Sequence, residues 1–583
     1  MASTIAMFSA LSGLNAHARS LDVIGNNIAN VNTTAYKSSR AVFADMFSWT
    51  VRGATPPTAE SGGTNPSQLG FGVRVAGTQR DMTSGTLSPS GNPRDLAVDG
   101  NGFFVVERNG GERYTRSGNF QFDADQNLTT VDGDRVLGYG IDDAFTVQPG
   151  ALVPINIPLG QLRVAEATSR VGLTGNVNAS GTLATSGAVY RLGGNGTAGF
   201  GLIAGATVPP TAPNVLEETS LLSEIEDPDL PGSGQTLFGV GQTLSMESVR
   251  KGNLTLPTAG LLIEATTTVA DLMQFLASAM GVVTGGTNPD GFSPGVLLNT
   301  ETGELTLVGN TGSVNELEIE PTDLVLREAD GTLVRTPMAI DQQASANGES
   351  VRTSTVVFDS LGQAVELDVT MTLVERGDAG TVWRYDVASA DDTDVDLAIA
   401  SGTVAFDTRG RLLTTDPVSV SIDRTGTGAA TPLTFDLTFQ NGEGAVTALS
   451  DVGSQIAAAY RDGAPLGTLE EFAVDRDGVI YGSFSNTMVR PLGQVVLAVF
   501  TNPEGLSASG GTVYEAGPNS GPAVISAPGG LGSGQVVSGA LELSNVDIGK
   551  EFINMVLAST GYNASSRVIQ TSNDLLDRLL AIQ

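Results

Sequence analysis

Glycine and proline are nearly absent from the two ends of this chain and crowd the region between them. The chain has 583 residues with 73 glycines and 26 prolines, yet residues 1–50 and 541–583 hold two glycines each and no proline. Both residue types disfavour helix interiors. The distribution therefore predicts long helices at the two ends. Between them it predicts a large body of short elements joined by turns, long enough for several domains.

An apolar rhythm of alternating four- and three-residue steps runs through both ends, as in a helix that presents one seam to a partner. The predicted seam residues, which we interpret as a self-assembly surface, are Met7, Leu11, Leu14, Leu21 and Ile28 near the N-terminus and Phe552, Met555, Tyr562, Ile569, Leu576 and Leu580 near the C-terminus. Polar residues interrupt the C-terminal seam at Ser559, Ser566 and Asn573. These interruptions argue against a tight two-stranded coiled coil.

The energies of such helices indicate how they are used. Burial of about a dozen seam side chains contributes roughly 20–35 kcal/mol. Ordering the backbone of roughly 70 terminal residues costs about 70–140 kcal/mol before hydrogen bonds offset part of it. We therefore expect the ends to be loose in a single chain and to become helical against other copies of the chain. The alternative is an ordinary helical hairpin docked on a globular core.

Between the ends, alternating apolar and polar residues predict β-strands. Residues 365–373 alternate as in a half-buried strand. Glycine-containing turns at 377–380 and 475–478 are typical of hairpins. One internal helix is predicted near 269–280, where Thr268 can cap an apolar stripe. The expected fold class is mainly β with α-helical termini.

Charge and composition exclude several classes of protein. The chain has 63 acidic and 30 basic residues, a formal net charge of −33, so a nucleic-acid backbone would be repelled. With no cysteine and one histidine, disulfides, cysteine-based zinc sites and thiol nucleophiles are excluded. No apolar run reaches the roughly 20 residues of a membrane helix, so no membrane insertion is expected. The start lacks the features of a cleaved signal peptide, which fits a cytoplasmic chain or export without cleavage.

Three segments have the outline of ligand sites but lack the required residues. Residues 194–199 match the glycine pattern of a dinucleotide site, yet no helix is predicted after them. Residues 123–134 begin like a calcium loop, but Leu128 stands where the sharp turn needs glycine. The acids of 391–396 are typical of an exposed loop, and His17 of a helix surface or interface. We predict no catalytic residue, no cofactor and no metal site, and we do not expect an enzyme.

Seven short motifs mark the ends and the predicted strands. They are Ser-Ala-Leu-Ser-Gly-Leu at 9–14, Gly-Asn-Asn-Ile-Ala-Asn-Val-Asn-Thr-Thr at 25–34, Leu-Ala-Val-Asp-Gly-Asn-Gly-Phe-Phe at 96–104, Tyr-Thr-Arg-Ser-Gly-Asn-Phe at 114–120, Val-Leu-Gly-Tyr at 136–139, Phe-Asp-Ser-Leu-Gly at 358–362 and Gly-Ala-Leu-Glu-Leu-Ser-Asn-Val-Asp at 539–547. With them the chain resembles the axial proteins of the bacterial flagellum, and as a whole their hook-protein branch. The motif residues at the ends are Asn26, Asn27, Asn30 and Thr34, and Ser544, Asn545, Val546 and Asp547.

The chain departs from the family pattern in two places. Members usually continue the motif at 25–34 with Gly-Phe-Lys, where this chain has Ala35, Tyr36 and Lys37. The Gln-Arg-x-Tyr that usually follows the last motif keeps only Tyr562.

The resemblance implies nested β-sandwich or barrel-like modules on a terminal, coiled-coil-like helical domain. The implied parts are the terminal helices at 1–35 and 541–583, a connector at 36–75 and 520–540, a first β domain at 76–168 and 452–519, a second β domain at 169–189 and 350–451, and an inserted outer domain at 190–349. The insertion matches no motif of the family. In the family the terminal helices of many copies form an inner tube and the β domains form the outer layers.

The function that the resemblance implies is structural. Such a chain is a subunit of the flagellar hook, a homo-oligomeric curved tube that acts as a universal joint and transmits motor torque to the filament. It leaves the cell unfolded through the flagellar type III export apparatus and is extracellular afterwards. Its expected partners are the rod, hook-cap, hook-length-control and hook–filament junction proteins. The alternatives are a distal rod or hook–filament junction protein, or, outside the family, a secreted β-rich adhesin or a polysaccharide-acting enzyme.

Overall fold

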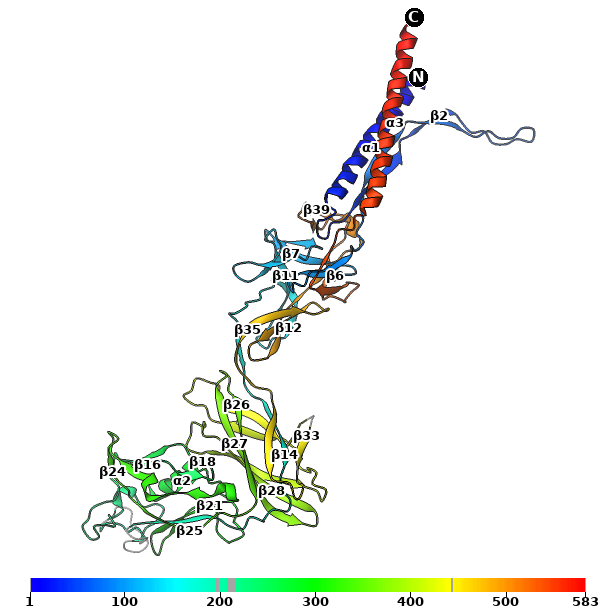
Figure 1. The fold of residues 1–583 in the computed structure, drawn as a ribbon. Coiled ribbons are helices and arrows are strands. Elements are labelled where there is room, and N and C mark those ends of the chain that lie inside the picture. Colours follow the sequence, from blue (N-terminus) through cyan, green and yellow to red (C-terminus); the bar gives the residue numbers. More distant parts are fainter. Residues whose placement is uncertain (1, 195–198, 205, 207–214, 442–443, 582–583) are drawn as a thin grey trace. The chain divides into compact units, whose positions relative to one another are not determined.

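The computed structural model describes residues 2–194, 199–204, 206, 215–441 and 444–581 (Figure 1). The chain forms two compact units, one made of Met1–Arg163 with Thr468–Gln583 and the other of Val164–Gly467. The middle of the sequence is therefore inserted into a unit built from the two ends. Each unit is described by itself.

The first unit carries the long helices. Helix α1 spans Ala2–Ala29 and helix α3 spans Ile548–Ala581, and the two lie side by side and antiparallel (Figure 1). Both ends are thus helical, which confirms the fold class that the glycine and proline distribution predicts. The expectation that these helices order only against other copies stays a prediction.

The β part of the first unit is a continuous sheet with several small ribbons. Its strands are β1 Ser39–Asp45, β2 Ser48–Arg52, β3 Ser67–Gly70, β4 Val73–Arg80, β5 Leu87–Pro89, β6 Leu96–Asp99, β7 Phe103–Arg108, β8 Gly111–Thr115, β9 Gln121–Phe122, β10 Leu128–Thr129, β11 Arg135–Ile141, β12 Val147–Pro154, β36 Val479–Phe484, β37 Val489–Val495, β38 Leu497–Val499, β39 Ser507–Gly510, β40 Val513–Glu515, β41 Val524–Ser526, β42 Gln535–Ser538 and β43 Ala540–Glu542. Strands β13 (Arg163–Glu166) and β35 (Ala464–Val474) are the remaining neighbours in the order of the sheet.

Strands from the two ends of the sequence pair repeatedly in this unit. The central order β37-β11-β7-β8-β40 places three N-terminal strands between two C-terminal strands, and β6 pairs with β42 as β5 does with β43. Aromatic side chains fill the core, where the rings of Tyr114 and Phe500 meet edge to face with centroids 4.8 Å apart. The first unit can therefore close only when both ends of the chain are present.

The second unit contains two hydrophobic cores. One core lies in a part that we call the second β body, where the sheet β26-β27-β28-β29 packs on a second sheet that includes β30, β31 and β14. Its strands are β14 Arg170–Asn176, β26 Ser350–Phe358, β27 Ala364–Gly377, β28 Gly380–Ala388, β29 Ala398–Phe406, β30 Val418–Ile422, β31 Leu433–Thr438, β32 Gln440–Asn441, β33 Gly444–Thr447 and β34 Gln455–Arg461. The predicted strand at 365–373 lies within β27, and Gly377 faces Gly380 across the predicted hairpin turn.

The inserted body has its own core between small sheets and a helix. Its elements are β15 Gly187–Gly193, β16 Thr243–Met246, β17 Arg250–Lys251, β18 Leu254–Thr255, β19 Ala259–Leu262, α2 Val269–Ala279, β20 Gly295–Asn299, β21 Glu304–Thr311, β22 Leu317–Glu318, β23 Leu324–Arg327, β24 Leu333–Arg335 and β25 Ala339–Ala344. Helix α2 forms where the apolar stripe predicts it, and Thr268 and Asp271 make a reciprocal capping box. The finer domain limits expected from the sequence stay predictions.

Candidate functional site

Helices α1 and α3 approach each other through small side chains. A Cβ atom added at Gly561 would lie 2.5 Å from the His17 ring, and one at Gly13 would lie 3.0 Å from the Oγ of Ser565. Ala558 of α3 is buried. Small residues let helix backbones come close, so this contact is tight but buries little apolar surface. His17 is half-buried against Phe43, which places the histidine at an interface, as its helical position indicates.

The predicted seam residues do not form the core of this helix pair. No seam side chain that the structure describes is fully buried. Leu11 and Phe552 are 47% and 49% exposed, and Tyr562 is exposed too. The half-buried members are Met7, Leu14, Leu21, Ile28, Met555, Ile569 and Leu576. The side chain of Leu580 lies outside the described residues.

Apolar side chains of the helices other than the eleven predicted seam residues are exposed as well. The members are Phe8, Ile548, Ile553, Val556, Leu557, Val568 and Leu575, and Leu557 is 65% exposed. With the exposed seam residues, they leave the helix pair with apolar side chains that nothing in the described chain covers. Apolar patches of this kind mark surfaces that another protein covers.

A short ribbon next to α1 is exposed as well. Every residue of β2 and β3 is exposed, whereas the neighbouring hairpin β1–β4 packs on α1. The contact with α1 depends on Gly72, whose φ is +101° and whose added Cβ would lie 2.0 Å from the Oγ of Ser12. The Ser12 hydroxyl in turn accepts the backbone N–H of Val73 at 3.1 Å.

The asparagines of the motif at 25–34 end α1 and turn the chain into β1. The buried Asn27 side chain donates to the carbonyl of Ser39 at 2.7 Å and accepts its N–H at 3.0 Å. Asn26 donates to the Tyr36 hydroxyl at 2.9 Å, and Asn30 donates to the Asn26 carbonyl at 2.9 Å. Thus the motif residues bond mainly within their own turn, which fixes the direction in which the chain leaves the helix.

Ala35 occupies a position that favours glycine. It is fully buried, its φ is +57°, and its N–H donates to the carbonyl of Glu542 at 2.8 Å. An L-residue in this left-handed region is strained. The departure from the family pattern at this residue therefore has a conformational cost.

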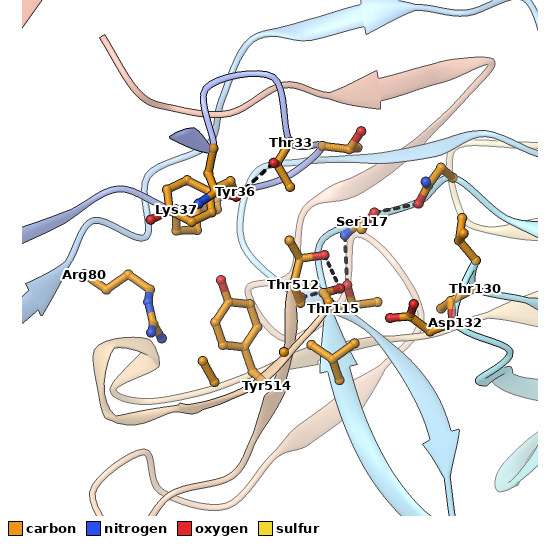
Figure 2. A pocket seen from close by; sticks show the side chains of 18 of the residues that line it. Thr33, Tyr36, Lys37, Arg80, Thr115, Ser117, Thr130, Asp132, Thr512 and Tyr514 are labelled. Atoms are coloured by element: carbon orange, nitrogen blue, oxygen red, sulfur yellow. Dashed lines mark hydrogen bonds between the residues drawn. The ribbon is translucent and has the colours of Figure 1, made fainter. Parts of the chain in front are cut away.

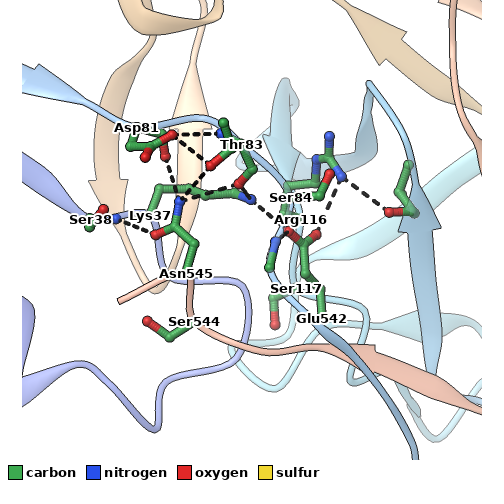
Figure 3. A network of polar contacts seen from close by, with 12 residues as sticks. Lys37, Ser38, Asp81, Thr83, Ser84, Arg116, Ser117, Glu542, Ser544 and Asn545 are labelled. Carbon is green, nitrogen blue, oxygen red and sulfur yellow. Dashed lines mark hydrogen bonds and ion pairs between the residues drawn. The ribbon is translucent and has the colours of Figure 1, made fainter. Parts of the chain in front are cut away.

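A buried ion network joins three parts of the first unit (Figure 3). The Glu542 carboxylate lies 2.5 Å from the Nζ of Lys37 and 3.3 Å from an Nη of Arg116, and all three side chains are buried. It also accepts the N–H of Gly85 at 2.8 Å, while Lys37 donates to the Thr83 carbonyl at 2.6 Å. Burial lowers the pKa of Lys37 and of Arg116, and the shared carboxylate opposes that shift.

The motif at 539–547 binds the N-terminal segment and starts α3. The Asn545 side chain accepts the N–H of Ser38 at 2.8 Å and donates to the Asp81 carbonyl at 2.9 Å. Two further motif residues act locally: the Ser544 hydroxyl accepts the N–H of Val546 at 3.4 Å, and the Asp547 carboxylate accepts the N–H of Lys550 at 3.1 Å. Since α3 begins at Ile548, Asp547 is its N-cap.

Lys37, Arg116 and Glu542 stand in or next to sequence motifs, but nothing in those motifs predicts that the three side chains contact one another. Strand alternation offered one signal, because Ala540 and Glu542 face the same side of β43 and are both buried. Thr34 of the N-terminal motif lines a polar cleft of about 480 Å³ beside the network (Figure 2). The charged residues of that cleft are Lys37, Arg80 and Asp132, and the rest of its lining is neutral.

The segments that resemble ligand sites in the sequence do not form such sites in the described residues. Asp123 accepts the N–H groups of Asp125 and Asn127, which makes the calcium-like segment a hydrogen-bonded turn. Residues 195–198 of the glycine pattern lie outside the described residues. Among the residues that the structure describes, no group of three acidic, histidine or cysteine side chains could hold a metal. No helix formed by the described residues is long and apolar enough to cross a membrane.

Comparison with known proteins returns four family models that match separate parts of the chain. They are a flagella basal body rod protein model over residues 7–37, a flagellar hook protein FlgE/F/G D1 domain over 97–185, a flagellar basal body protein FlaE D2 domain over 328–464, and a flagellar basal body rod FlgEFG protein C-terminal model over 537–582. The first and last cover the two helices with their motifs.

Several relatives that align with nearly the whole chain share one name. The flagellar hook protein FlgE of Salmonella typhimurium is 26% identical over 98% of this chain and 99% of its own. Those of Escherichia coli and Borreliella burgdorferi are 27% and 26% identical over 99% of this chain, and over 100% and 99% of theirs. The crystal structure of Helicobacter pylori flagellar hook protein FlgE2 aligns with 18% identity and a TM-score of 0.37, covering 77% of this chain and 98% of that one.

Proposed function

This chain belongs to the family of bacterial flagellar hook and basal-body rod proteins, and on that premise we propose that it polymerises through its two terminal helices into the tube of the flagellar hook. The family is structural, and the relatives that match along the whole chain are hook proteins. The protein is thus a hook subunit, and its place is the flagellum. Its function is to transmit torque from the motor to the filament.

One observation supports the assembly proposal. The helix pair exposes apolar side chains, while the chain segments next to the helices are bound to the β part through Lys37, Arg116 and Glu542. Leu11, Phe552 and Leu557 remain exposed although both helices are fully formed. An assembly of many copies can bury such side chains at about 1.5–3 kcal/mol each. The helices of neighbouring copies are the proposed occupants of this surface.

The buried network explains how force on the helices would reach the rest of the subunit. Lys37 follows α1, Glu542 precedes α3, and Arg116 belongs to the β part, so one carboxylate links all three. A load on either helix passes through this link to the sheet. The outer β domains are proposed to slide on their neighbours as the tube bends, through contacts with small energy differences.

The finer partners belong to the same proposal. We expect end-to-end contacts with the rod and with the hook-cap, hook-length-control and hook–filament junction proteins, and passage through the flagellar export apparatus. No catalytic role is proposed, because the family is structural and the joint is built from side chains that bond to one another.

Deletion of residues 1–30 tests the proposal. The truncated protein should keep its β secondary structure by circular dichroism but form no tubes under the electron microscope. The full-length protein should form short, curved tubes of uniform width. Wild-type polymers from the truncated protein would contradict the role of the helices, straight tubes would favour a rod protein, and a full-length protein that stays monomeric would favour an adhesin.

A further inference from the structure

In the second unit, the inserted body is connected to the second β body by a neck of two chain segments. The side chain of Asn347 accepts the N–H groups of Thr185 at 2.8 Å and Ser186 at 3.0 Å. Glu349 donates its N–H to the carbonyl of Thr182 at 2.8 Å. Because the two segments bond to each other, the neck holds together and can serve as a pivot between the bodies.

Away from the neck, the bodies meet through both polar and apolar contacts. From β26, Arg352 donates to the backbone carbonyls of Lys251 and Val314 of the inserted body, both at 2.9 Å. Leu397, which precedes β29, is buried in the core of the inserted body. A small cavity of about 30 Å³ lies at this contact, which is room for a water molecule.

The side chain of Lys251 is enclosed in this contact. The residue is 8% exposed, and its Nζ donates to the carbonyl of Gly281, just beyond the C-terminal end of α2, at 2.6 Å. An ammonium group has three donors, and among the described residues this is its one hydrogen bond to protein. The charged side chains that face it are Asp386 and Arg384 of β28, Asp368 of β27 and Arg352 of β26.

The surrounding charges do not neutralise the ammonium. Asp386 is already paired with Arg384 at 3.0 Å, and no carboxylate of the described residues lies within 4.0 Å of the Lys251 Nζ. On the same strand as Lys251, Arg250 pairs with Glu318 of β22 at 3.2 Å, and both of these side chains are exposed. A buried cation without an ion pair disfavours the enclosed state, whereas a neutral amine does not.

We propose that Lys251 is a proton-operated latch between the inserted body and the second β body, which closes when the side chain releases its proton and opens when the side chain takes one up. Burial lowers the pKa of Lys251 from 10.5 to about 8 in the closed form. In the open form the side chain reaches water and keeps the ordinary value. Between pH 8 and pH 10.5 the open form binds more protons than the closed form, so a rise in pH favours closure. From pH 7 to pH 9 the ratio of closed to open molecules increases about tenfold.

The proton on Lys251 can be observed directly in the full-length protein. The chain has three lysines, Lys37, Lys251 and Lys550. Carbon-13 labelling at lysine Cε therefore gives three NMR signals, and the signal that disappears in the Lys251→Met variant is assigned to this residue. A titration midpoint near pH 8 supports the latch. A midpoint near 10.5 overturns it, and this measurement on the wild-type chain does not depend on whether a variant folds.

Opening is measured by hydrogen exchange of peptides that contain β17 and β26, corrected for the intrinsic pH dependence of exchange. Opening in the wild type should fall about tenfold between pH 7 and pH 9. In Lys251→Met, which keeps the length of the side chain without the charge, it should change less than about twofold. Lys550→Met, at an exposed lysine of α3, should behave like the wild type. An equal pH response in Lys251→Met and the wild type refutes the latch.

Discussion

Among single residues, Glu542 has the greatest influence on the joint between the helices and the β part. Its carboxylate pairs with two buried cations, so without it both Lys37 and Arg116 lose the anion that they share. Removing one partner of a buried ion network leaves charges that water cannot reach, and such a loss costs more than the network contributes.

Glu542→Gln should destabilise the first unit by about 3–5 kcal/mol, because Lys37 and Arg116 are then buried without an anion. Denaturant-dependent hydrogen exchange of peptides from β42 and β43 measures this loss. Asp132→Asn, at an exposed partner of Arg108, is the matched control and should cost less than about 1 kcal/mol. Equal effects of the two substitutions would show that the network does not hold the joint.

Ala35 offers a test of backbone strain. Ala35→Gly should change the stability of the first unit by less than about 1 kcal/mol, since relief of the positive φ offsets the greater freedom of glycine in the unfolded chain. Ala35→Val should destabilise it by about 2 kcal/mol or more, because a β-branched residue fits the left-handed region poorly. Thermal unfolding of both variants checks the order, and an equally tolerated valine would contradict the strain.

Asp423 makes the second unit sensitive to acid. The hydroxyls of Thr431, Thr425 and Thr393 donate to its carboxylate and lower its pKa to about 2. A lowered pKa means that the stabilisation is present above the ordinary value of 3.8 and is lost as the pH falls through 2. The melting temperature should therefore fall more between pH 4 and pH 2 in the wild type than in Asp423→Asn. Identical slopes would contradict this role.

At the scale of elements, the pair of α1 and α3 combines a close backbone contact with an exposed apolar surface. The small residues Gly13, Gly561 and Ala558 let the helices approach closely, while larger apolar side chains such as Phe552 and Leu557 remain exposed. Such a division lets one chain form the pair while leaving most of its hydrophobic surface for other copies.

Two glycine substitutions distinguish the effect of the α1–α3 contact from the effect of helix propensity. Gly25→Ala meets no atom within 4 Å and should stabilise the helix by about 0.5–1 kcal/mol. Gly561→Ala should lack this gain, because its Cβ would lie 2.5 Å from the His17 ring. Helix melting by circular dichroism compares them. Adding His17→Ala should restore the gain to Gly561→Ala; if it does not, the clash with His17 is not the reason that Gly561→Ala lacks the gain.

At the scale of the whole molecule, the termini are the proposed assembly surface, and they belong to a different unit from the inserted body. The first unit contains both ends of the chain, and its sheet closes with strands from each. Damage to the exposed helix surface should therefore affect the polymer and spare the subunit.

Leu557→Asp should abolish polymerisation while changing the stability of the monomer by less than about 1 kcal/mol, because the leucine is exposed in the single chain. Sedimentation and electron microscopy measure the polymer. Leu531→Asp provides the control, since this leucine is 75% exposed in a loop outside the helices. Tubes of normal yield from Leu557→Asp would exclude this surface from assembly.

The sequence by itself determined the local structure of this protein. The helical ends, the hairpin turn at 377–380 and the cap of α2 at Thr268 depend on residues a few positions apart, so their patterns can be read directly. The tertiary structure decided which distant groups meet. Lys37 and Glu542 are 505 positions apart, and the charged residues that face Lys251 lie more than a hundred positions later in the sequence. Burial of a charge depends on the path of the whole chain, and no local pattern records that path.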